Sequence, residues 1–342
     1  MPTQVHAVVG CGRIAPNHVD AFRALPDVEV RWAVDRDPEV AERFAAEYDV
    51  PRHGTDLDEA LADPELTSVS VTVDHAQHTA IADRALRAGR HVLVEKPFAT
   101  RVDDAQATVA LARERDRVLS VVSQHRYDPV VEAVADWVSA GLLGRITQAH
   151  AVLECFRGPE YYADYWHGTR DGEGGSALIN QGYHPLDVLR VLCGGRLQVV
   201  GATAGTLVLG DAMDNEDTLA AVLRAPDGLA ATYSVTVTSS VEWRSRIGLT
   251  GTEGSVVFDL DHPGELHHCA GSAKLLGRAD ELRNLVRVEP APGTSYYGSS
   301  HRRQVAEFVA AVRTGAPVRA DADEGLATLE LIDALYTAAG AR

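Results

Sequence analysis

One lysine stands where an amine could do chemistry. Only two of the 32 basic residues Lys and Arg are lysines, Lys96 and Lys274. Lys96 follows an apolar run, residues 92–94, and lies between Glu95 and Pro97. Arginine cannot replace lysine where an amine must give up a proton or act as a compact point charge. Hydride chemistry on an alcohol needs such a group, whereas the alternative interpretation of Lys96 is an exposed lysine in a loop.

A second set of polar residues recurs on one predicted helical face. Residues 176–193, after a pair of glycines, are predicted to form a helix, and Asn180, His184 and Asp187 recur in it at i, i+4 and i+7. Histidine is the side chain best suited to proton transfer near neutral pH. His184 is therefore a candidate acid or base that Asp187 orients. The alternative is a core histidine bonded to Asp187.

A glycine-rich turn near the start of the sequence matches a dinucleotide-binding motif. A β-like apolar run leads into residues 10–15, which read G-x-G-x-x-A before a helix-like segment. A second strand, 28–34, ends at Asp35, about 20 residues after the second glycine, as in Rossmann folds. Gly10 would permit the tight turn, and Gly12 would let the backbone approach a pyrophosphate at the N-terminus of the helix.

The acid after the second strand bears on the choice of cofactor. Asp35 can accept hydrogen bonds from the ribose 2′-hydroxyl of NAD, whereas Arg36 could meet the 2′-phosphate of NADP. NAD is the predicted cofactor, and NADP is the alternative. The predicted cofactor contacts are Gly10, Gly12, Arg13, Ile14, Asp35, Arg36, Thr72, Val73, His75, His78, Glu95, Lys96, Pro97 and Gln124.

The first part of the chain alternates strands and helices. After the glycine motif, strands are predicted at 28–34, 69–73, 91–94 and 118–122, and helices at 38–48, 56–62, 78–88 and 102–115. This alternation predicts an α/β domain with a doubly wound parallel sheet, the Rossmann arrangement, over residues 1–123. Ligands bind beyond the carboxyl ends of such strands, where Lys96 and His75 fall. At His78, which begins a predicted helix, we expect a cap or packing role.

The remainder, residues 124–342, is predicted to be an α+β domain with a large open, mostly antiparallel sheet. The predicted strands are 146–155, 198–206, 217–224, 229–238, 244–251, 254–259 and 265–269, and the predicted helices are 128–140, 176–193, 300–314 and 323–339. Burying the uncovered face of an open sheet against a second copy predicts a homodimer or homotetramer.

Charge and composition exclude several classes of partner. A net charge of −17 argues against binding to nucleic acid or to an anionic membrane. We expect no signal peptide, because strand-like residues begin by Val5, and no membrane span, because no apolar run reaches about 18 residues. The four cysteines form no CxxC pair, which favours reduced thiols in the cytoplasm. No metal is predicted, because the spacing of His262, His267, His268 and Cys269 fits no standard zinc pattern.

Together these motifs resemble the Gfo/Idh/MocA oxidoreductase family. The resemblance rests on the glycine turn with Asp35, on Glu95–Pro97 and on the segment from Gly174 to Asp187, and His301 and Phe308 also fit. It implies an NAD(P)-dependent dehydrogenase or reductase that acts on a secondary hydroxyl or keto group. The substrates implied are sugars, other polyols such as cyclitols, and nucleotide-linked sugars. It also implies dimers or tetramers formed through the open sheet.

The resemblance implies roles for individual residues. Lys96 would lie beside the nicotinamide and the reacting carbon, often before a cis proline, and His184 would be the acid/base or its partner. Position 180 is often aspartate in inositol-type members. Because asparagine exchanges no proton at working pH, the proton step here falls to Lys96 and His184. Glu95 is expected to bind the nicotinamide ribose.

Aromatic side chains and hydrogen-bond donors precede the glycine pair, a mix that suits a sugar ring. Residues 166–170 depart from the Trp-Arg-Gly-Thr-Trp segment common in the family, and Val73 stands where proline is common. The predicted catalytic residues are Lys96, His184, Asn180 and Asp187. The predicted substrate contacts are Lys96, Arg126, Tyr162, Trp166, His167, Arg170, Asn180, His184 and His301.

Three other functions fit the same motifs. An NADP-dependent 3-ketosugar reductase of a secondary-metabolite pathway would differ in its cofactor. A glycoside-cleaving enzyme with tightly bound NAD would release a leaving group without net NADH. A non-catalytic NAD-binding regulator would need neither Lys96 nor His184, and both are present here.

Overall fold

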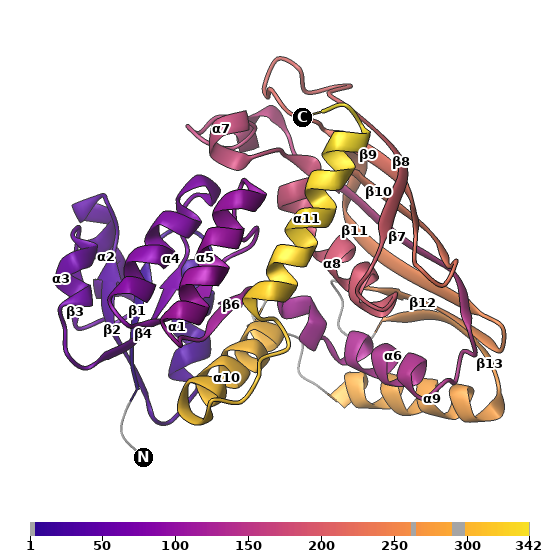
Figure 1. Ribbon diagram of the computed structural model, residues 1–342, viewed down its shortest axis with the longest axis horizontal. Coiled ribbons are helices and arrows are strands. Elements are labelled where there is room, and N and C mark those ends of the chain that lie inside the picture. Colours follow the sequence, from indigo (N-terminus) through magenta and orange to yellow (C-terminus); the bar gives the residue numbers. More distant parts are fainter. Residues whose placement is uncertain (1–3, 261–264, 289–297, 342) are drawn as a thin grey trace. The chain divides into compact units, whose positions relative to one another are not determined.

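The computed structural model describes residues 4–260, 265–288 and 298–341 (Figure 1). Contacts divide these residues into two compact units. The first holds residues 4–124 and 298–327, and the second holds 125–260, 265–288 and 328–341.

Helix α10 (Gly298–Thr314) packs with the first unit. The sequence-based boundary after residue 123 had assigned this helix to the second domain. Phe308 of α10 meets Phe22 of α1 (Ala15–Arg23) edge to face, with the ring centroids 6.3 Å apart. Both rings are buried in one apolar cluster with Val8 and Val122. The apolar face of α10 is therefore covered by the N-terminal residues.

The first unit contains the predicted Rossmann sheet. Its six strands are parallel and lie in the order β3-β2-β1-β4-β5-β6. Their bounds are β1 (Gln4–Val9), β2 (Val28–Val34), β3 (Arg52–Gly54), β4 (Leu66–Val71), β5 (His91–Val94) and β6 (Leu119–Val121). Only the short edge strand β3 was not predicted.

Helices connect these strands as the alternating pattern predicted. They are α1, α2 (Pro38–Glu47), α3 (Leu57–Leu61), α4 (His78–Arg87) and α5 (Val102–Glu114), with a short turn η1 (His75–Gln77) before α4. Asp37 caps α2, and Asp56 caps α3 by accepting a hydrogen bond from the Asp58 N–H at 2.9 Å.

The second unit is built on a seven-stranded sheet in the order β13-β12-β11-β7-β10-β9-β8. All neighbouring strands are antiparallel except the parallel pair β7 and β10, which confirms a mostly antiparallel sheet. The bounds are β7 (Ile146–Phe156), β8 (Gln198–Gly205), β9 (Thr218–Arg224), β10 (Ala230–Thr236), β11 (Thr238–Gly251), β12 (Gly254–Asp259) and β13 (Leu266–Gly271).

One face of this sheet is covered and the other is exposed. Along β9, Leu219, Ala221 and Leu223 are buried, whereas Val222 between them is 49% exposed. Helix α8 (Tyr183–Leu192) packs against β7 and β11, and α6 (Pro129–Ser139) lies beside α9 (Ala273–Val288) (Figure 1). Helix α9 was not predicted.

The predicted helix 176–193 is interrupted. A π-helical turn, η4 (Ala177–Gln181), is followed by Gly182 and then by α8. Pro185 has no N–H to donate to the Gln181 carbonyl, so a continuous α-helix would lose that bond. The Tyr233 hydroxyl donates to the Gly182 carbonyl at 2.8 Å, in space that a side chain at Gly182 would fill.

The remaining elements are η2 (Gln124–Tyr127), η3 (Pro159–Tyr162), α7 (Arg170–Glu173) and α11 (Ala322–Ala338). Among the residues that the structure describes, none of the helices has both the length and the hydrophobicity to cross a bilayer.

Candidate functional site

The glycine turn is fixed by close packing at the end of β1. Gly10 has φ +94°, and a Cβ there would lie 2.5 Å from the Thr72 carbonyl oxygen. The Thr72 hydroxyl donates to the Gly10 carbonyl at 2.6 Å. Glycine is therefore required at position 10 both by the backbone conformation and by the approach of the neighbouring strand end.

Asp35, at the end of β2, is tied to the same turn. Its Oδ2 accepts a hydrogen bond from the Cys11 N–H at 2.8 Å, and its Oδ1 accepts one from the Asp37 N–H at 3.0 Å. A carboxylate has about four acceptor positions, so both oxygens can still accept from a ribose. The neighbouring Arg36 is exposed, with Nη1 3.8 Å from the Asp74 carboxylate.

These residues fit a dinucleotide. A Cβ at Gly12 would meet no atom of the described residues within 4 Å, so the backbone there faces open space. Helix α1 begins beyond it with Ile14 at the N-cap, a residue without a side-chain acceptor for the first N–H groups. Such N–H groups and the positive end of the helix dipole suit a pyrophosphate.

The two glycines should respond differently to replacement by alanine. Gly10→Ala is expected to destabilise the fold, because its Cβ would overlap the Thr72 carbonyl. Gly12→Ala is expected to keep the unfolding midpoint of the wild type but to weaken NAD binding at least about tenfold, because its methyl group occupies the space for the pyrophosphate. Thermal unfolding and NADH fluorescence titration measure the two effects. Equal losses of stability, or unchanged NAD affinity in Gly12→Ala, would contradict this assignment.

Glu95 is a buried carboxylate directly after β5. Its Oε1 lies 2.9 Å from His18 Nε2 and 3.7 Å from His301 Nε2, and its Oε2 accepts from the Lys96 N–H at 3.1 Å. Burial would raise the pKa of Glu95, but hydrogen bonds and charge from His18 and His301 hold it well below its usual value. Glu95 is therefore ionised, and His18 and His301 fix its position.

His301 was predicted to contact substrate. It is 2% exposed and belongs to α10, where its Nε2 lies 3.7 Å from Glu95 Oε1. Its contact with a substrate stays a prediction.

Lys96 is half-buried, and the Lys96–Pro97 peptide bond is cis, as the resemblance implied. His78 lies behind this segment, with Nδ1 2.7 Å from the Pro97 carbonyl oxygen and Nε2 3.0 Å from that of Val73. His78 is fully buried and holds the end of β4 to that of β5, as expected of a packing residue, and its predicted contact with a cofactor stays a prediction.

The other predicted cofactor residues differ in exposure. Arg13 is exposed, Ile14 is half-buried, and Thr72, His75 and Gln124 are buried. Their contacts with a cofactor stay predictions.

In the second unit, Asn180 lies on the π-helical turn and faces a carboxylate. Its Nδ2 donates to Glu173 Oε1 at 2.5 Å and lies 3.3 Å from the Tyr161 hydroxyl. Gln181 Nε2 donates to the same hydroxyl at 3.0 Å. Sequence reasoning missed Glu173, whose only signal was an acid directly before the glycine pair.

His184 packs among aromatic rings. Its ring meets those of His125 and Tyr183 edge to face, with the ring centroids 4.8 and 5.5 Å apart. His125 Nδ1 in turn lies 2.7 Å from Asp128 Oδ2, in a buried pair that the sequence analysis did not single out. The surroundings of His184 are thus set by a second histidine with its own carboxylate.

Asp187 is bound to arginine. Arg126 donates from Nε and Nη2 to its two oxygens at 2.7 and 2.6 Å, and the Thr328 hydroxyl donates at 2.6 Å. Arg190 Nη2 lies 3.7 Å away. All four side chains are buried. Arg126 was predicted to contact substrate and Asp187 to orient His184. The structure shows that the two side chains form an ion pair with each other, and the two predicted roles stay predictions.

The predicted aromatic contacts form a local cluster. His167 Nδ1 binds Asp164 Oδ2 at 2.5 Å, and the His167 ring stacks on Trp166 at 3.6 Å. Tyr162 is buried against Tyr161, with the ring centroids 5.0 Å apart. Their contact with a substrate stays a prediction.

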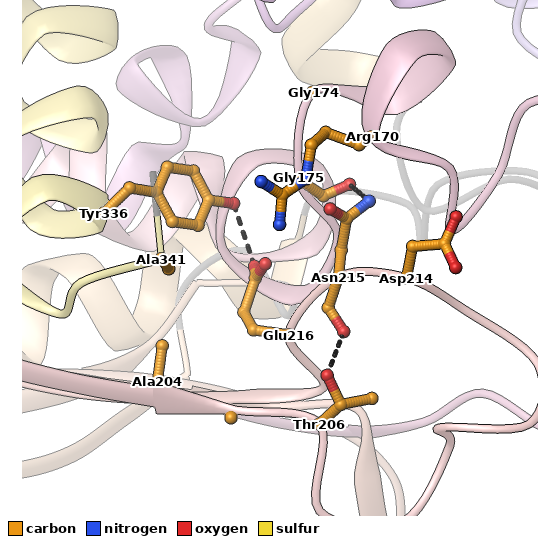
Figure 2. Close-up of a pocket in the computed structure, with 11 residues that line it drawn as sticks. Arg170, Gly174, Gly175, Ala204, Thr206, Asp214, Asn215, Glu216, Tyr336 and Ala341 are labelled. Atoms are coloured by element: carbon orange, nitrogen blue, oxygen red, sulfur yellow. Dashed lines mark hydrogen bonds between the residues drawn. The ribbon is translucent and has the colours of Figure 1, made fainter.

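Arg170 lines a cavity of about 130 Å³ beside the glycine pair (Figure 2). Glu216 Oε1 in this cavity accepts from the Tyr336 hydroxyl at 2.9 Å and from the Leu178 N–H at 2.9 Å. Asn215 donates to the Gly175 carbonyl at 3.2 Å. The cavity walls therefore hold the turn and the start of the π-helix that carries Asn180.

The histidines near the end of the sheet have separate partners. His267 Nε2 lies 2.6 Å from Asp259 Oδ2 and 3.1 Å from Arg246, whose charge disfavours a cation there. His268 Nε2 lies 3.0 Å from the Ser255 hydroxyl. His262 falls outside the described residues.

Comparison with known proteins shows the family to which the chain belongs. Residues 5–123 match the model of an oxidoreductase family with an NAD-binding Rossmann fold, and residues 131–257 match the Gfo/Idh/MocA C-terminal domain. The chain is 30% identical to dTDP-3,4-didehydro-2,6-dideoxy-alpha-D-glucose 3-reductase of Streptomyces violaceoruber, over 97% of this chain and 94% of the relative.

Two further comparisons support the same family. Inositol 2-dehydrogenase of Rhizobium meliloti is 24% identical over 96% of this chain and 94% of its own length. The WlbA dehydrogenase from Bordetella pertussis, solved with NADH and UDP-GlcNAcA, superimposes with a TM-score of 0.88 at 26% identity, covering 99% of this chain and 96% of that one. The chain therefore belongs to the Gfo/Idh/MocA family of NAD-binding oxidoreductases.

Proposed function

We propose that the protein transfers a hydride between NAD and a secondary hydroxyl or keto carbon of a nucleotide-linked sugar. The observation that carries this proposal is the set of groups that follow the carboxyl ends of strands β1, β2 and β5 in one parallel sheet. The glycine turn and Asp35 suit a dinucleotide, and Glu95 with Lys96 follows β5 in the same sheet. When bound, the nicotinamide supplies the hydride donor or acceptor.

In this proposal, Lys96 and His184 together carry out the proton step of the reaction. An ammonium at Lys96 bonds the substrate oxygen and stabilises the negative charge that develops on it. His184 takes or gives the hydroxyl proton, as an imidazole can near neutral pH. Asn180 offers a hydrogen bond to the substrate but no proton.

The relatives favour nucleotide-linked sugars over free polyols. The 30%-identical Streptomyces violaceoruber protein is a reductase of a dTDP-linked ketosugar, and the Bordetella pertussis structure holds UDP-GlcNAcA. The aromatic and polar side chains around Trp166 and Tyr162 suit a sugar ring. The exposed face of the seven-stranded sheet supports a homo-oligomer, either a dimer or a tetramer.

A second candidate is an NADP-dependent 3-ketosugar reductase, and the name of the Streptomyces violaceoruber relative supports the 3-reductase part of it. NAD is preferred because the Asp35 carboxylate, which is expected to meet the ribose, would repel a 2′-phosphate, and because Arg36 lies near Asp74. Comparing the affinities for NADH and NADPH separates the two candidates.

A substrate screen tests the proposal. The protein with NAD or NADP would be offered nucleoside-diphosphate hexoses, free hexoses and inositols, and the absorbance of the reduced nicotinamide would be followed. We expect turnover with a nucleoside-diphosphate hexose and at least about tenfold lower kcat/KM with the free sugar. Cleavage of a glycoside without net NADH, or NAD binding without turnover of any of these substrates, would overturn it.

A further inference from the structure

A buried carboxylate that the proposed mechanism does not use faces Asn180. Glu173, the last residue of α7, is 0% exposed. Its Oε1 accepts from Asn180 Nδ2 at 2.5 Å, and its Oε2 accepts from the Gly168 N–H at 2.6 Å. Both oxygens of the carboxylate are therefore used as acceptors, and one of them binds a predicted substrate contact.

The surroundings of Glu173 make its ionisation costly. Burial is the largest effect and raises its pKa to about 7, although hydrogen bonds from Asn180 and Gly168 act in the opposite direction. The Glu216 charge raises it further. Among the described residues, the hydroxyls of Tyr161, Tyr162 and Tyr336 also interact with Glu173, and a hydrogen bond from the Ser176 side chain lowers its pKa. Glu173 can therefore be present in either form near neutral pH.

The form of Glu173 decides how the Asn180 amide can turn. An amide carries a donor NH₂ group on one side and an acceptor oxygen on the other. An ionised carboxylate only accepts, so it requires the NH₂ group to face it, as in the structure. A protonated carboxyl group can donate to the amide oxygen instead, and the NH₂ group is then released.

We propose that Glu173 is a positioning residue: its ionised form holds Asn180 with Oδ1 turned away from Glu173 and toward the substrate, and its protonated form lets the amide turn over. This inference rests on the proposed function, in which Asn180 meets the substrate oxygen. With Oδ1 presented, Asn180 accepts a hydrogen bond from a hydroxyl. With NH₂ presented, it donates to a keto oxygen. The ionised form of Glu173 therefore favours binding of the alcohol, and the protonated form favours binding of the ketone.

The test follows the Asn180 side chain in the whole protein without cofactor or substrate. The protein would be labelled with ¹⁵N-asparagine, and the Asn180 amide signal would be identified by its loss in Asn180→Asp. We expect this signal in the wild type to shift with pH, with a midpoint near the Glu173 pKa of about 7. In Glu173→Gln, whose side chain has a donor and an acceptor at every pH, the shift should vanish. Asp171→Asn, which removes an exposed carboxylate from the same helix, should titrate as the wild type does.

Two results would overturn the proposal. One is a wild-type Asn180 signal that does not move with pH. The other is a signal that moves with the same midpoint in Glu173→Gln. Should Glu173→Gln not fold, Glu173→Asp takes its place: its shorter side chain withdraws the carboxylate from Asn180, so a titration identical to the wild type would equally refute the role.

A stability measurement gives a second readout. Because folding raises the pKa of Glu173 from its usual 4.5 to about 7, the wild type should lose stability relative to Glu173→Gln as pH rises between these values, with no further change above them. A difference in denaturation midpoint that stays constant with pH would contradict the raised pKa. Neither experiment depends on Lys96 or His184. Both experiments can therefore be interpreted even if the proposed proton transfer by these two residues proves wrong.

Discussion

Replacing Lys96 by methionine is expected to lower kcat by about 10³-fold or more while NAD still binds. The ammonium is proposed to contact the substrate oxygen, and removing such an electrostatic contact typically costs about 10²–10³ in rate, with a further loss if the group also assists proton transfer. The turn at Gly10, Asp35 and the Glu95 carboxylate keep their partners in this variant, because the Lys96 contact to Glu95 is made by the main chain.

The chain offers a matched control. Lys274, the only other lysine, is exposed at the start of α9, and Lys274→Met should leave kcat unchanged. NADH fluorescence titration and initial rates on the nucleotide sugar found in the screen measure the two effects. If Lys96→Met retains turnover with that substrate, the lysine has no part in the chemistry.

Replacing Asp187 by alanine should destabilise the second unit by about 3–5 kcal/mol, because it leaves buried guanidinium groups without their counter-charge. Arg126 binds both oxygens of Asp187, and Arg190 lies 3.7 Å away. Burial would raise the pKa of Asp187, yet Arg126 and Arg190 hold it below its usual value. This stabilisation is therefore present above the ordinary carboxyl pKa and is lost as pH falls through the lower pKa of the folded state.

Urea unfolding of Asp187→Ala, Arg126→Ala and the double variant measures the coupling between the two side chains. An exposed pair serves as the control: Asp323, bound to Arg113 at the surface, should cost only about 0.2–1 kcal/mol when replaced by alanine. A loss of the same small size in Asp187→Ala would show that the buried pair contributes little.

The first unit could be predicted almost completely, because its signals are local. The strand β1, the glycine turn and β2 ending at Asp35 follow one another in the order that the motif predicts. The packing of α10 onto α1 could not be predicted. Phe308 and Phe22 are nearly three hundred residues apart, and no local pattern connects them.

The second unit was predicted in outline, and its errors have physical causes. The i, i+4 spacing of Asn180 and His184 assumed one α-helix, whereas Pro185 and the approach of Tyr233 to Gly182 produce a π-helical turn and a break. π-Turns of this kind are frequent at functional sites. Helix α9 was missed although Leu275 and Leu282, spaced by seven residues, are both buried.

Candidate site residues could be identified from the sequence where they belong to a short motif. Residues that are brought to the candidate site only by the packing of distant segments could not. Glu95 and Lys96 could be identified from three adjacent residues. The partners of these groups come from distant segments: His18 and His301 for Glu95, and Glu173 for Asn180. Arg126 and Asp187 have the residue types expected of a site, and only the structure shows that they form a buried ion pair.

The central claim is hydride transfer to or from a ring carbon of a nucleotide-linked sugar, and isotope transfer tests it most directly. The protein would be incubated with a nucleoside-diphosphate ketohexose and NADH that carries deuterium at both positions of the nicotinamide C4, and the product would be analysed by mass spectrometry and NMR. The account predicts one deuterium on the carbon that bore the keto group in the wild type, and none in Lys96→Met. Reduction without deuterium on that carbon, or full transfer in Lys96→Met, would contradict it.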